Sequence, residues 1–337
     1  MSAAQDDLRN LIAGYWKPHM AIAAARLGVA DAMDDSGCQA AGLAAAIGAD
    51  AEALARFLRA LASIGLVRDL GDDSFALTPM GERLRADHPE SLKGMALHVG
   101  TQLSPAFAEL HECVTKGKPP AHIKYGPEGF AGLDEDAEAA AVFNQAMVDN
   151  SRRFAAQAAE LYDFARFASI MDVGGGYGAV LATLLQAAPQ ARGCVLDMAH
   201  ARDGAEAYFA REGVADRARF VTASFFEPLP ETADCYVLKY ILHDWAEEPA
   251  RQIVQRVGEA ARASGGTVVV IEKVMPEKVE ADPGHAVALY GDMTMMLWDG
   301  RERTRSQFAE LLAHGGLALT RMVELSDNHH LLEAVPT

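Results

Sequence analysis

Hydrophobic and polar positions in the first ninety residues follow the spacing of amphipathic helices and then of two short strands. Large apolar side chains recur every three or four positions until Gly28, where we expect the first helix to end. Asp50 is a candidate N-cap, and Gly71-Asp72-Asp73 is typical of a hairpin turn. Together these elements predict a winged helix, with helices over 8–28, 41–48 and 50–64 and strands over 66–68 and 75–78.

The remaining residues change from helical spacing to short apolar strands that alternate with helices. Residues 91–168 are predicted to be helical, with a long helix over 137–162, except for a Gly/Pro-rich loop over 116–132. The alternation after residue 169 predicts a parallel, doubly wound sheet, and the last two strands are joined too tightly to be parallel. The predicted strands are 170–173, 193–196, 219–222, 236–238, 267–271, 317–323 and 330–334.

These patterns predict an α/β protein made of three regions. With about 150 residues per domain as a guide, 337 residues suffice for two domains and a connection. We expect a winged-helix N-terminal domain over 1–95, a helical linker over 96–165, and a Rossmann-like domain over 166–337. The sheet of the last region should end in an antiparallel hairpin.

The first predicted helix carries more large apolar side chains than its alanine-rich surroundings can cover. Leu11, Ile12, Tyr15, Trp16 and Met20 lie within ten residues of one another. An uncovered apolar patch of this kind normally marks an interface. We therefore predict a homodimer.

The charge of the chain argues against nucleic acid and membrane partners. The formal net charge is −17, and residues 1–90 hold eight Lys or Arg against thirteen Asp or Glu. A winged helix that reads DNA usually has a basic surface. The first residues are acidic, unlike a signal peptide, and no apolar run approaches the 18 residues of a membrane helix. We expect a cytoplasmic protein that binds neither DNA nor membranes.

The cysteines and the paired histidines do not form a metal motif. His329-His330 has no third ligand at a recognisable spacing, and neighbouring residues of a strand point to opposite faces. We expect no metal, and reduced thiols at the four scattered cysteines, which are Cys38, Cys113, Cys194 and Cys235.

A glycine-rich segment after the first parallel strand predicts a nucleoside-containing cofactor. Gly174 and Gly176 allow the backbone to turn sharply and to approach a ligand at the start of a helix. Asp197 ends the next strand, where a carboxylate can accept hydrogen bonds from ribose hydroxyls. The glycine spacing also fits a dinucleotide. The position of the loop in a C-terminal domain and the final hairpin favour S-adenosylmethionine over NAD.

Nearly the whole chain, from about residue 8 to 334, resembles the S-adenosylmethionine-dependent O-methyltransferases of the caffeic acid and hydroxyindole type. Bacterial members of this family modify aromatic natural products. The segment 143–151 resembles the family's interdomain helix. The resemblance implies a dimerising N-terminal domain, a pocket-forming linker, S-adenosylhomocysteine as product and a hydroxylated aromatic substrate. The five matching segments, in order, are Asp172–Gly178, Val195–Met198, Ser224–Pro230, Leu238–Trp245 and Gly300–Thr304.

The resemblance also assigns roles to individual residues. A phenol with a pKa near 10 needs a base before it attacks a methyl group, and His243 follows a strand at the ligand-binding edge of the sheet. The family implies His243 as that base, between Glu272 and Glu302. It implies cofactor contacts from Gly174, Gly176, Asp197, Met198, Ser224, Phe225 and Lys239, and substrate contacts from Phe143, Met147, Asp244, Asp292 and Met296.

One departure from the family keeps alternatives open. Ser224 stands where family members commonly have an aspartate that accepts hydrogen bonds from the adenosine. An enzyme that uses this fold for other chemistry, such as hydroxylation or decarboxylation, is one alternative. The glycine loop leaves an NAD-dependent oxidoreductase as a second, and the winged helix leaves a ligand-responsive transcription factor as a third. The methionine-rich segment 287–298 fits either a core or an aromatic-binding pocket.

Overall fold

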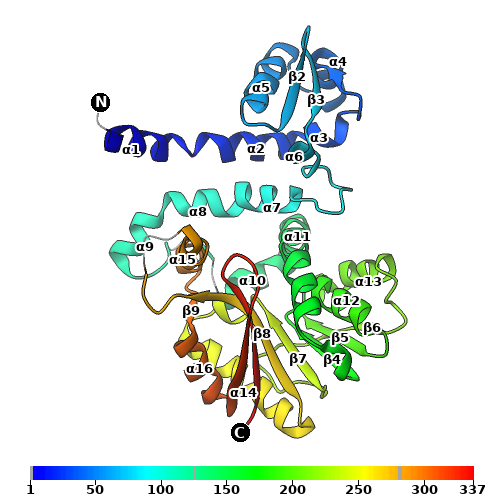
Figure 1. The fold of residues 1–337 in the computed structure, drawn as a ribbon, viewed down its shortest axis with the longest axis vertical. Coiled ribbons are helices and arrows are strands. Elements are labelled where there is room, and N and C mark those ends of the chain that lie inside the picture. Colours follow the sequence, from blue (N-terminus) through cyan, green and yellow to red (C-terminus); the bar gives the residue numbers. More distant parts are fainter. Residues whose placement is uncertain (1–2, 121, 125, 280–282) are drawn as a thin grey trace. The chain divides into compact units, whose positions relative to one another are not determined.

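The computed structural model describes residues 3–120, 122–124, 126–279 and 283–337. The chain forms two compact units, Met1–Pro105 and Ala106–Thr337 (Figure 1). The helical region between the two predicted domains is shared between these units. No helix within the described ranges is long and apolar enough to cross a membrane.

The first unit is the predicted winged helix. Its small sheet has the order β1-β3-β2, and the side chain of Asp50 accepts a hydrogen bond from the Ala53 amide at the start of α5. The elements are α1 (Ala3–Ala13), α2 (Trp16–Leu27), α3 (Val29–Ala32), β1 (Cys38–Gln39), α4 (Ala40–Ile47), α5 (Ala51–Ser63), β2 (Val67–Gly71), β3 (Ser74–Leu77), α6 (Pro79–Glu82), α7 (Lys93–His98) and the π-helix η1 (Val99–Leu103).

The single helix predicted over 8–28 is two helices. It is interrupted at Gly14 and Tyr15, and α2 ends at Gly28 as expected. Pro18 explains the interruption, because proline has no N–H to donate to the carbonyl four residues earlier and its ring clashes with that carbonyl, here Gly14.

The second unit contains a seven-strand path in the order β10-β11-β8-β7-β4-β5-β6, with β9 paired to β8. The strands from β8 to β6 along this path are parallel, whereas β11 pairs antiparallel with both β8 and β10. The predicted sheet and its final hairpin are confirmed. The strands are β4 (Ser169–Val173), β5 (Arg192–Asp197), β6 (Ala218–Thr222), β7 (Cys235–Lys239), β8 (Thr267–Met275), β9 (Arg303–Thr304), β10 (Leu317–Glu324) and β11 (His329–Pro336).

Helices cover both faces of this sheet (Figure 1). One buried cluster joins one face to α11, α12 and α13, and a second joins the other face to α14 and α16. All the helices from residue 104 onward, including α8, which spans the boundary between the units, are α8 (Ser104–Ala108), α9 (Leu110–Lys116), α10 (Gly126–Glu135), α11 (Ala137–Leu161), α12 (Ala179–Ala187), α13 (Arg202–Arg211), α14 (Glu247–Ser264), α15 (Pro283–Met296) and α16 (Arg305–His314), with short 3₁₀ turns η2 (Phe164–Arg166), η3 (Ala199–Ala201) and η4 (Leu242–Asp244).

The loop predicted over 116–132 is wrong in its second half, because α10 begins at Gly126. Tertiary packing outweighs the local glycine and proline content there. Phe130 lies 5.6 Å from Trp245 and 6.0 Å from Phe143 between ring centroids, and Leu133 is buried. Residues 121 and 125 of the predicted loop lie outside the described residues.

Candidate active site

The glycine loop lies where β4 ends and α12 begins. Gly174, Gly176 and Gly178 all have positive φ angles, of 73°, 54° and 76°, a region that side chains disfavour. A Cβ atom at Gly174 would lie 2.4 Å from Cδ1 of Ile241, and one at Gly178 would lie 2.4 Å from Cε1 of Phe209. The loop therefore requires glycine for both conformation and space.

Asp197 fastens this loop to the end of β5. Its Oδ2 accepts a hydrogen bond of 2.6 Å from the Gly176 amide, and its Oδ1 accepts one of 2.6 Å from the Met198 amide. Burial raises the pKa of Asp197, although both amide hydrogen bonds oppose that rise. Each carboxylate oxygen can accept a second hydrogen bond. The predicted ribose contact is therefore compatible with the bonds that Asp197 already makes.

Lys239 ends β7 with a buried ammonium group. The Nζ atom lies 3.4 Å from the centroid of the Tyr240 ring and makes no hydrogen bond within the part of the chain that the structure describes. Burial lowers the pKa of Lys239 to about 7. A buried donor without a partner is costly, so this edge of the sheet fits a ligand that supplies an acceptor.

The segment around Ser224 lies beside the glycine loop. A Cβ atom at Gly174 would lie 3.4 Å from Cε1 of Phe225, so that ring borders the loop. Phe225 and Phe226 pack edge-on against Trp245, with centroid distances of 5.9 and 4.7 Å. Ser224 is exposed, and its hydroxyl accepts from the Phe226 amide at 3.3 Å. In this structure the hydroxyl caps a turn.

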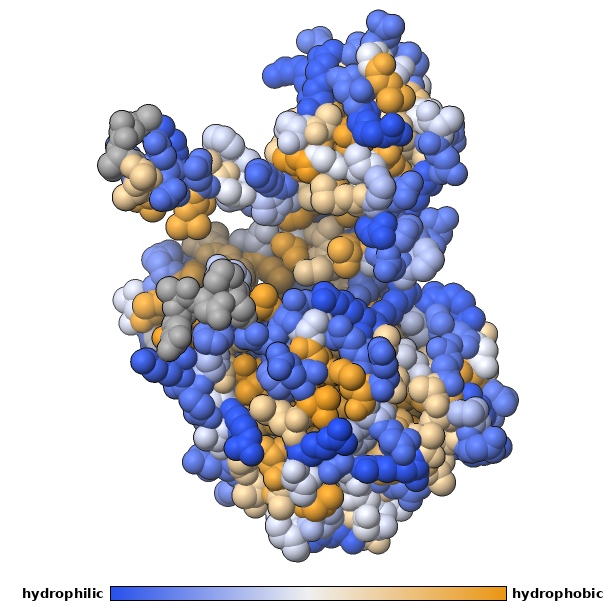
Figure 2. Space-filling view, in the orientation of Figure 1, coloured by the Kyte–Doolittle hydropathy of each residue, from blue (hydrophilic) through white to orange (hydrophobic). Residues whose placement is uncertain are grey.

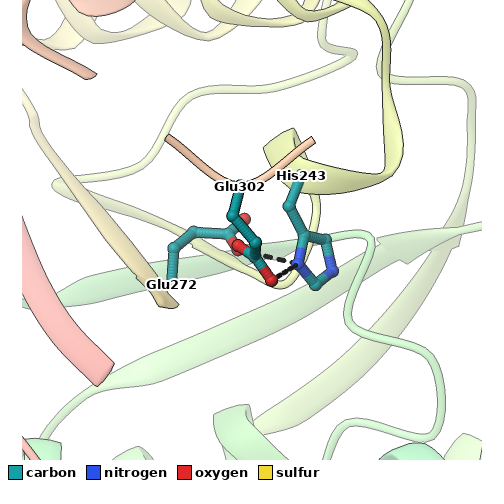
Figure 3. Close-up of side chains that lie close together, drawn as sticks. All are labelled: His243, Glu272 and Glu302. Atoms are coloured by element: carbon teal, nitrogen blue, oxygen red, sulfur yellow. Dashed lines mark hydrogen bonds and ion pairs between the residues drawn. The ribbon is translucent and has the colours of Figure 1, made fainter. Parts of the chain in front are cut away.

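His243 lies in η4, between β7 and α14, with its ring held against two carboxylates. Its Nδ1 is 3.1 Å from Oε1 of Glu302 and 3.3 Å from Oε2 of Glu272 (Figure 3). The other carboxylate oxygen of Glu272 accepts from the amides of Ile241 and Leu242, each at 3.0 Å. Glu272 thus orients both the imidazole and the turn that carries it.

The protonation of His243 follows from its neighbours. Because Nδ1 faces two carboxylates, this atom carries the proton and Nε2 is the nitrogen left to exchange one. Nε2 points away from both glutamates in Figure 3 and is 3.4 Å from Oδ1 of Asp244. Burial alone would lower the pKa of His243, but the charges of Glu272, Glu302 and Asp244 outweigh it and raise the pKa to about 9.

Two of these carboxylates are themselves shifted in opposite directions. Burial raises the pKa of Glu272. Burial acts in the same direction on Glu302, but His243 and Lys273 outweigh it and lower the pKa of that carboxyl. Glu302 is thus the group that stays ionised beside the imidazole.

Arg303 fixes the turn on both sides of the histidine. Its guanidinium is buried and donates to the carbonyl oxygens of Leu242, at 2.6 Å, and Trp245, at 3.2 Å. The Arg301 amide donates to the His243 carbonyl at 2.8 Å. The sequence analysis gave Arg303 no role. In the sequence, Arg303 is recognisable only as an arginine that follows the candidate Glu302. That position does not show whether the guanidinium is buried against carbonyl oxygens or exposed at the surface.

Of the residues predicted to contact substrate, two lie next to the His243 cluster and three lie elsewhere in the second unit. Asp292 accepts a hydrogen bond from the Glu302 amide at 2.9 Å and so helps to hold Glu302 in place. Asp244 lies directly beside His243. Phe143 joins the aromatic group around Phe130, and Met147 is partly buried one turn further along α11. Met296 packs with Ala106, Cys113 and Leu297.

The three groups in Figure 3 could in principle also surround a cation. One ligand atom from each of His243, Glu272 and Glu302 lies within 4.8 Å of the others. The Nζ atom of Lys273, however, is 3.5 Å from the same Glu302 oxygen that faces the imidazole. An ammonium group already compensates the negative charge there, which makes the cluster better suited to holding a proton than a metal ion.

Comparison with known proteins matches both units to one family. Residues 9–87 match the O-methyltransferase dimerisation domain and residues 107–318 match the O-methyltransferase domain. The chain is 33% identical to a phenazine O-methyltransferase of Lysobacter antibioticus over 98% of this chain and 95% of the relative. The solved structure of LaPhzM aligns over 100% of this chain and 100% of its own, with a TM-score of 0.92 and 31% identity.

A second solved structure is informative about ligands. It is an O-methyltransferase from neocarzinostatin biosynthesis in complex with S-adenosylmethionine and 2-hydroxy-5-methyl naphthoic acid. Its TM-score is 0.78 and its identity 33%, over 95% of this chain and 96% of that one.

Proposed function

The chain belongs to the O-methyltransferase family, and we propose that His243 is the general base of its reaction. In the proposed reaction a methyl group passes from S-adenosylmethionine to a hydroxyl of an aromatic small molecule. The observation that carries the proposal is the buried imidazole, with Nδ1 between Glu272 and Glu302 and with Nε2, beside Asp244, as the nitrogen that takes a proton when the ring is neutral. A nicotinamide oxidoreductase and a transcription factor have no support from the matched family. The base and both carboxylates are present, which also disfavours changed chemistry.

The residues around the glycine loop fit the cofactor. Three glycines with positive φ shape the turn into α12. The buried Lys239 ammonium packs on the Tyr240 ring but makes no hydrogen bond within the described residues, so it can donate one to a ligand. S-adenosylmethionine supplies an electrophilic methyl group when it is bound. The residues proposed to hold it are Gly174, Gly176, Asp197, Met198, Ser224, Phe225 and Lys239.

The carboxylates adjust His243 to the acidity of a phenol. Proton transfer from a phenol of pKa near 10 to an ordinary histidine of pKa about 6.5 is uphill by about 5 kcal/mol. With the pKa of His243 raised to about 9, the same transfer is uphill by only about 1.4 kcal/mol. Nε2 takes the proton as the oxygen attacks, and the imidazolium that results is stabilised by Glu272 and Glu302.

The proposed activity can be tested with a set of acceptors. The relatives suggest hydroxylated phenazines and hydroxynaphthoic acids. The protein is incubated with each acceptor and S-adenosylmethionine, and mass spectrometry detects the methylated product and S-adenosylhomocysteine. Methyl transfer to a phenolic oxygen that depends on His243 supports the proposal. Transfer that persists at full rate in His243→Ala would refute the role of the base.

Glu302→Gln should move the pH dependence of methyl transfer. Removing a carboxylate 3.1 Å from Nδ1 lowers the pKa of His243, by roughly one to three units for a charge this close. Since the neutral imidazole is the active form, the acidic limb of the kcat profile moves to lower pH. At alkaline pH the variant should be slower, because its base is weaker. The profile of kcat from pH 6 to 10 measures both effects.

Glu333→Gln is the matched control for this pH profile. Glu333 lies on β11 and bonds to Tyr162 and Arg166. An unchanged profile in the control and a shifted one in Glu302→Gln locate the effect at His243. A Glu302→Gln profile identical to that of the wild type would contradict the electrostatic role of this carboxylate.

Assembly into a homodimer through the first unit is also part of the proposal. None of the residues of α1 is buried, and Leu11 and Ile12 are 77% and 66% exposed. Tyr15 and Trp16 are exposed as well, and Figure 2 shows orange side chains at the surface where Figure 1 draws α1. Residues 9–87 match a dimerisation domain, which supports an interface here.

Leu11→Glu should dissociate the dimer. A charge placed in a buried apolar interface costs several kcal/mol, enough to weaken association by at least about a hundredfold. Light scattering should give twice 36.0 kDa for the wild type and 36.0 kDa for the variant. Val114→Glu, at a similarly exposed position in the second unit, should remain dimeric. A monomeric wild type would refute the interface.

A further inference from the structure

Tyr240 has an unusual backbone conformation next to the proposed base. Its φ angle is 58°, in the left-handed region that bulky side chains rarely adopt. It directly follows β7 and lies three residues before His243. Such a conformation persists only where the surroundings enforce it, and it is a reason to look for a role of the side chain.

The phenol of Tyr240 is anchored by a histidine from the far end of the chain. Its hydroxyl is hydrogen-bonded to Nε2 of His329, on β11. Nδ1 of His329 lies 3.1 and 2.9 Å from the carbonyl oxygens of Ser326 and Asp327, so this nitrogen carries the hydrogen. Nε2 is then an acceptor, and the tyrosine hydroxyl donates. Burial lowers the pKa of His329 to about 3, which keeps the ring neutral.

Four rings form a continuous column from α11 to the proposed base. Phe154 of α11 stacks on His329 with centroids 3.6 Å apart, and Tyr240 follows at 5.5 Å. The Tyr240 ring is stacked on the His243 imidazole at 4.7 Å and 29°. Glu272 and Glu302 hold the imidazole at Nδ1, and Asp244 faces Nε2. The stacked phenol ring restrains the direction that they leave free, which is tilting of the ring plane.

We propose that Tyr240 is a positioning residue for methyl transfer: stacked on His243 and anchored by His329, it sets the plane of the imidazole and so the direction of Nε2. The inference rests on the proposed function, in which Nε2 takes the acceptor's proton. The inference goes beyond the proposed function because it concerns a ring that need not touch cofactor or substrate.

The charged groups around His243 define what its titration reports. Glu272 faces it from β8, Glu302 from the residue before β9, and Asp244 from its own turn. Two ammonium groups lie near the Tyr240 ring, with Nζ of Lys239 and Lys273 at 3.4 and 5.1 Å from its centroid. Tyr240 and His329 are both neutral, so replacing either one removes no charge that faces His243. Tyr240→Leu also changes the surroundings of Lys239, whose pKa burial lowers to about 7 and whose Nζ packs on the ring. Shifts in the pKa of His243 in Tyr240→Phe and His329→Phe, which keep the Tyr240 ring or its aromatic replacement, therefore report a change in geometry.

The test is an NMR titration of the full-length protein with S-adenosylhomocysteine, with the His243 signal assigned by its loss in His243→Ala. In Tyr240→Leu, losing the π face should lower the pKa of His243 by about 0.5 to 1 unit. The kcat value with the fastest acceptor of the set should fall about ten- to a hundredfold, as for a small misplacement of a base. The affinity for S-adenosylhomocysteine should stay within about twofold in Tyr240→Phe, which keeps the ring on which Lys239 packs.

Two milder substitutions test the anchor and remain informative if Tyr240→Leu fails to fold. Tyr240→Phe removes the donor and His329→Phe removes the acceptor, while each keeps an aromatic ring. Each should shift the pKa of His243 in the same direction. The double variant should shift it no further than Tyr240→Phe, because that substitution already removes the Tyr240–His329 hydrogen bond, together with the one to Asn150. Unchanged titration in both single variants, or additive shifts in the double variant, would overturn the inference.

Tyr236→Phe is the matched control. Tyr236 is a buried tyrosine of β7, and its hydroxyl bonds to the Ala233 amide at 2.8 Å and Ser264 at 3.2 Å. It should lower the melting temperature without changing the His243 titration. Failure of this inference remains distinguishable from failure of the base. Inactive His243→Ala with unaffected Tyr240 variants rejects only the positioning role, whereas active His243→Ala rejects the proposed base.

Discussion

Replacing His243 with alanine should lower kcat by roughly 10²–10⁴, the usual contribution of a positioned general base. The side chain is 5% exposed, and its Nε2 is the nitrogen that neither glutamate faces. Without it, the acceptor must lose its proton to water, which a phenol of pKa near 10 does poorly at neutral pH. The loss should therefore shrink as the pH approaches the pKa of the acceptor.

Cofactor affinity distinguishes this role from a structural one. Calorimetry should give the same dissociation constant for S-adenosylhomocysteine in His243→Ala and the wild type, because the proposed cofactor residues lie around the glycine loop. His243→Gln offers a polar side chain with no useful basicity and should be nearly as slow. A His243→Ala variant that retains most of its turnover would reduce the imidazole to a packing element.

Replacing Asp197 with alanine should weaken S-adenosylmethionine and S-adenosylhomocysteine alike by about 1.5–3 kcal/mol, the scale of hydrogen bonds to a charged group. That corresponds to roughly 10- to 150-fold in the dissociation constant. The structure adds a second reason for a large effect. Asp197 accepts from the amides of Gly176 and Met198, so its removal also releases the glycine loop from β5.

Asp197→Asn separates the two contributions. An amide oxygen can keep one of the two amide hydrogen bonds but carries no charge. We expect an affinity between those of the wild type and Asp197→Ala. Asp203→Ala, at an exposed aspartate in the first turn of α13, controls for loss of a negative charge nearby. Wild-type affinity in Asp197→Ala would show that this carboxylate does not hold the cofactor.

The parallel sheet and the glycine loop could be predicted from the sequence because their signals are local. A strand buried on both faces appears as an apolar run, as in 268–271, and a loop with positive φ appears as clustered glycines. The break before α2 was missed although its cause, Pro18, is also local. The helix at 126–135 was missed because it depends on contacts of Phe130 with Phe143 and Trp245.

The site was predictable only as far as the resemblance reached. His243, Glu272 and Glu302 are far apart in sequence, and the structure brings them within hydrogen-bonding distance. The contribution of Arg303 and Tyr240 could not be anticipated, because each acts through groups brought together by the fold. The Arg303 guanidinium binds main-chain carbonyl oxygens, which every residue has, so the identities of Leu242 and Trp245 do not indicate the contact.

The turn that carries His243 is held through its main-chain atoms as well as by its buried side chains. Its amides bond to Glu272 and its carbonyls to Arg303 and the Arg301 amide. The side chains of Ile241 and Leu242 add packing in the core. The hydrogen bonds themselves involve no side chain of residues 241 and 242. Side chains that face the acceptor can be exchanged during evolution, or by design, without displacing the base. The residues that position the base and the residues that select the acceptor can therefore change separately. New acceptors can be acquired by substitutions that leave His243 and its hydrogen bonds in place.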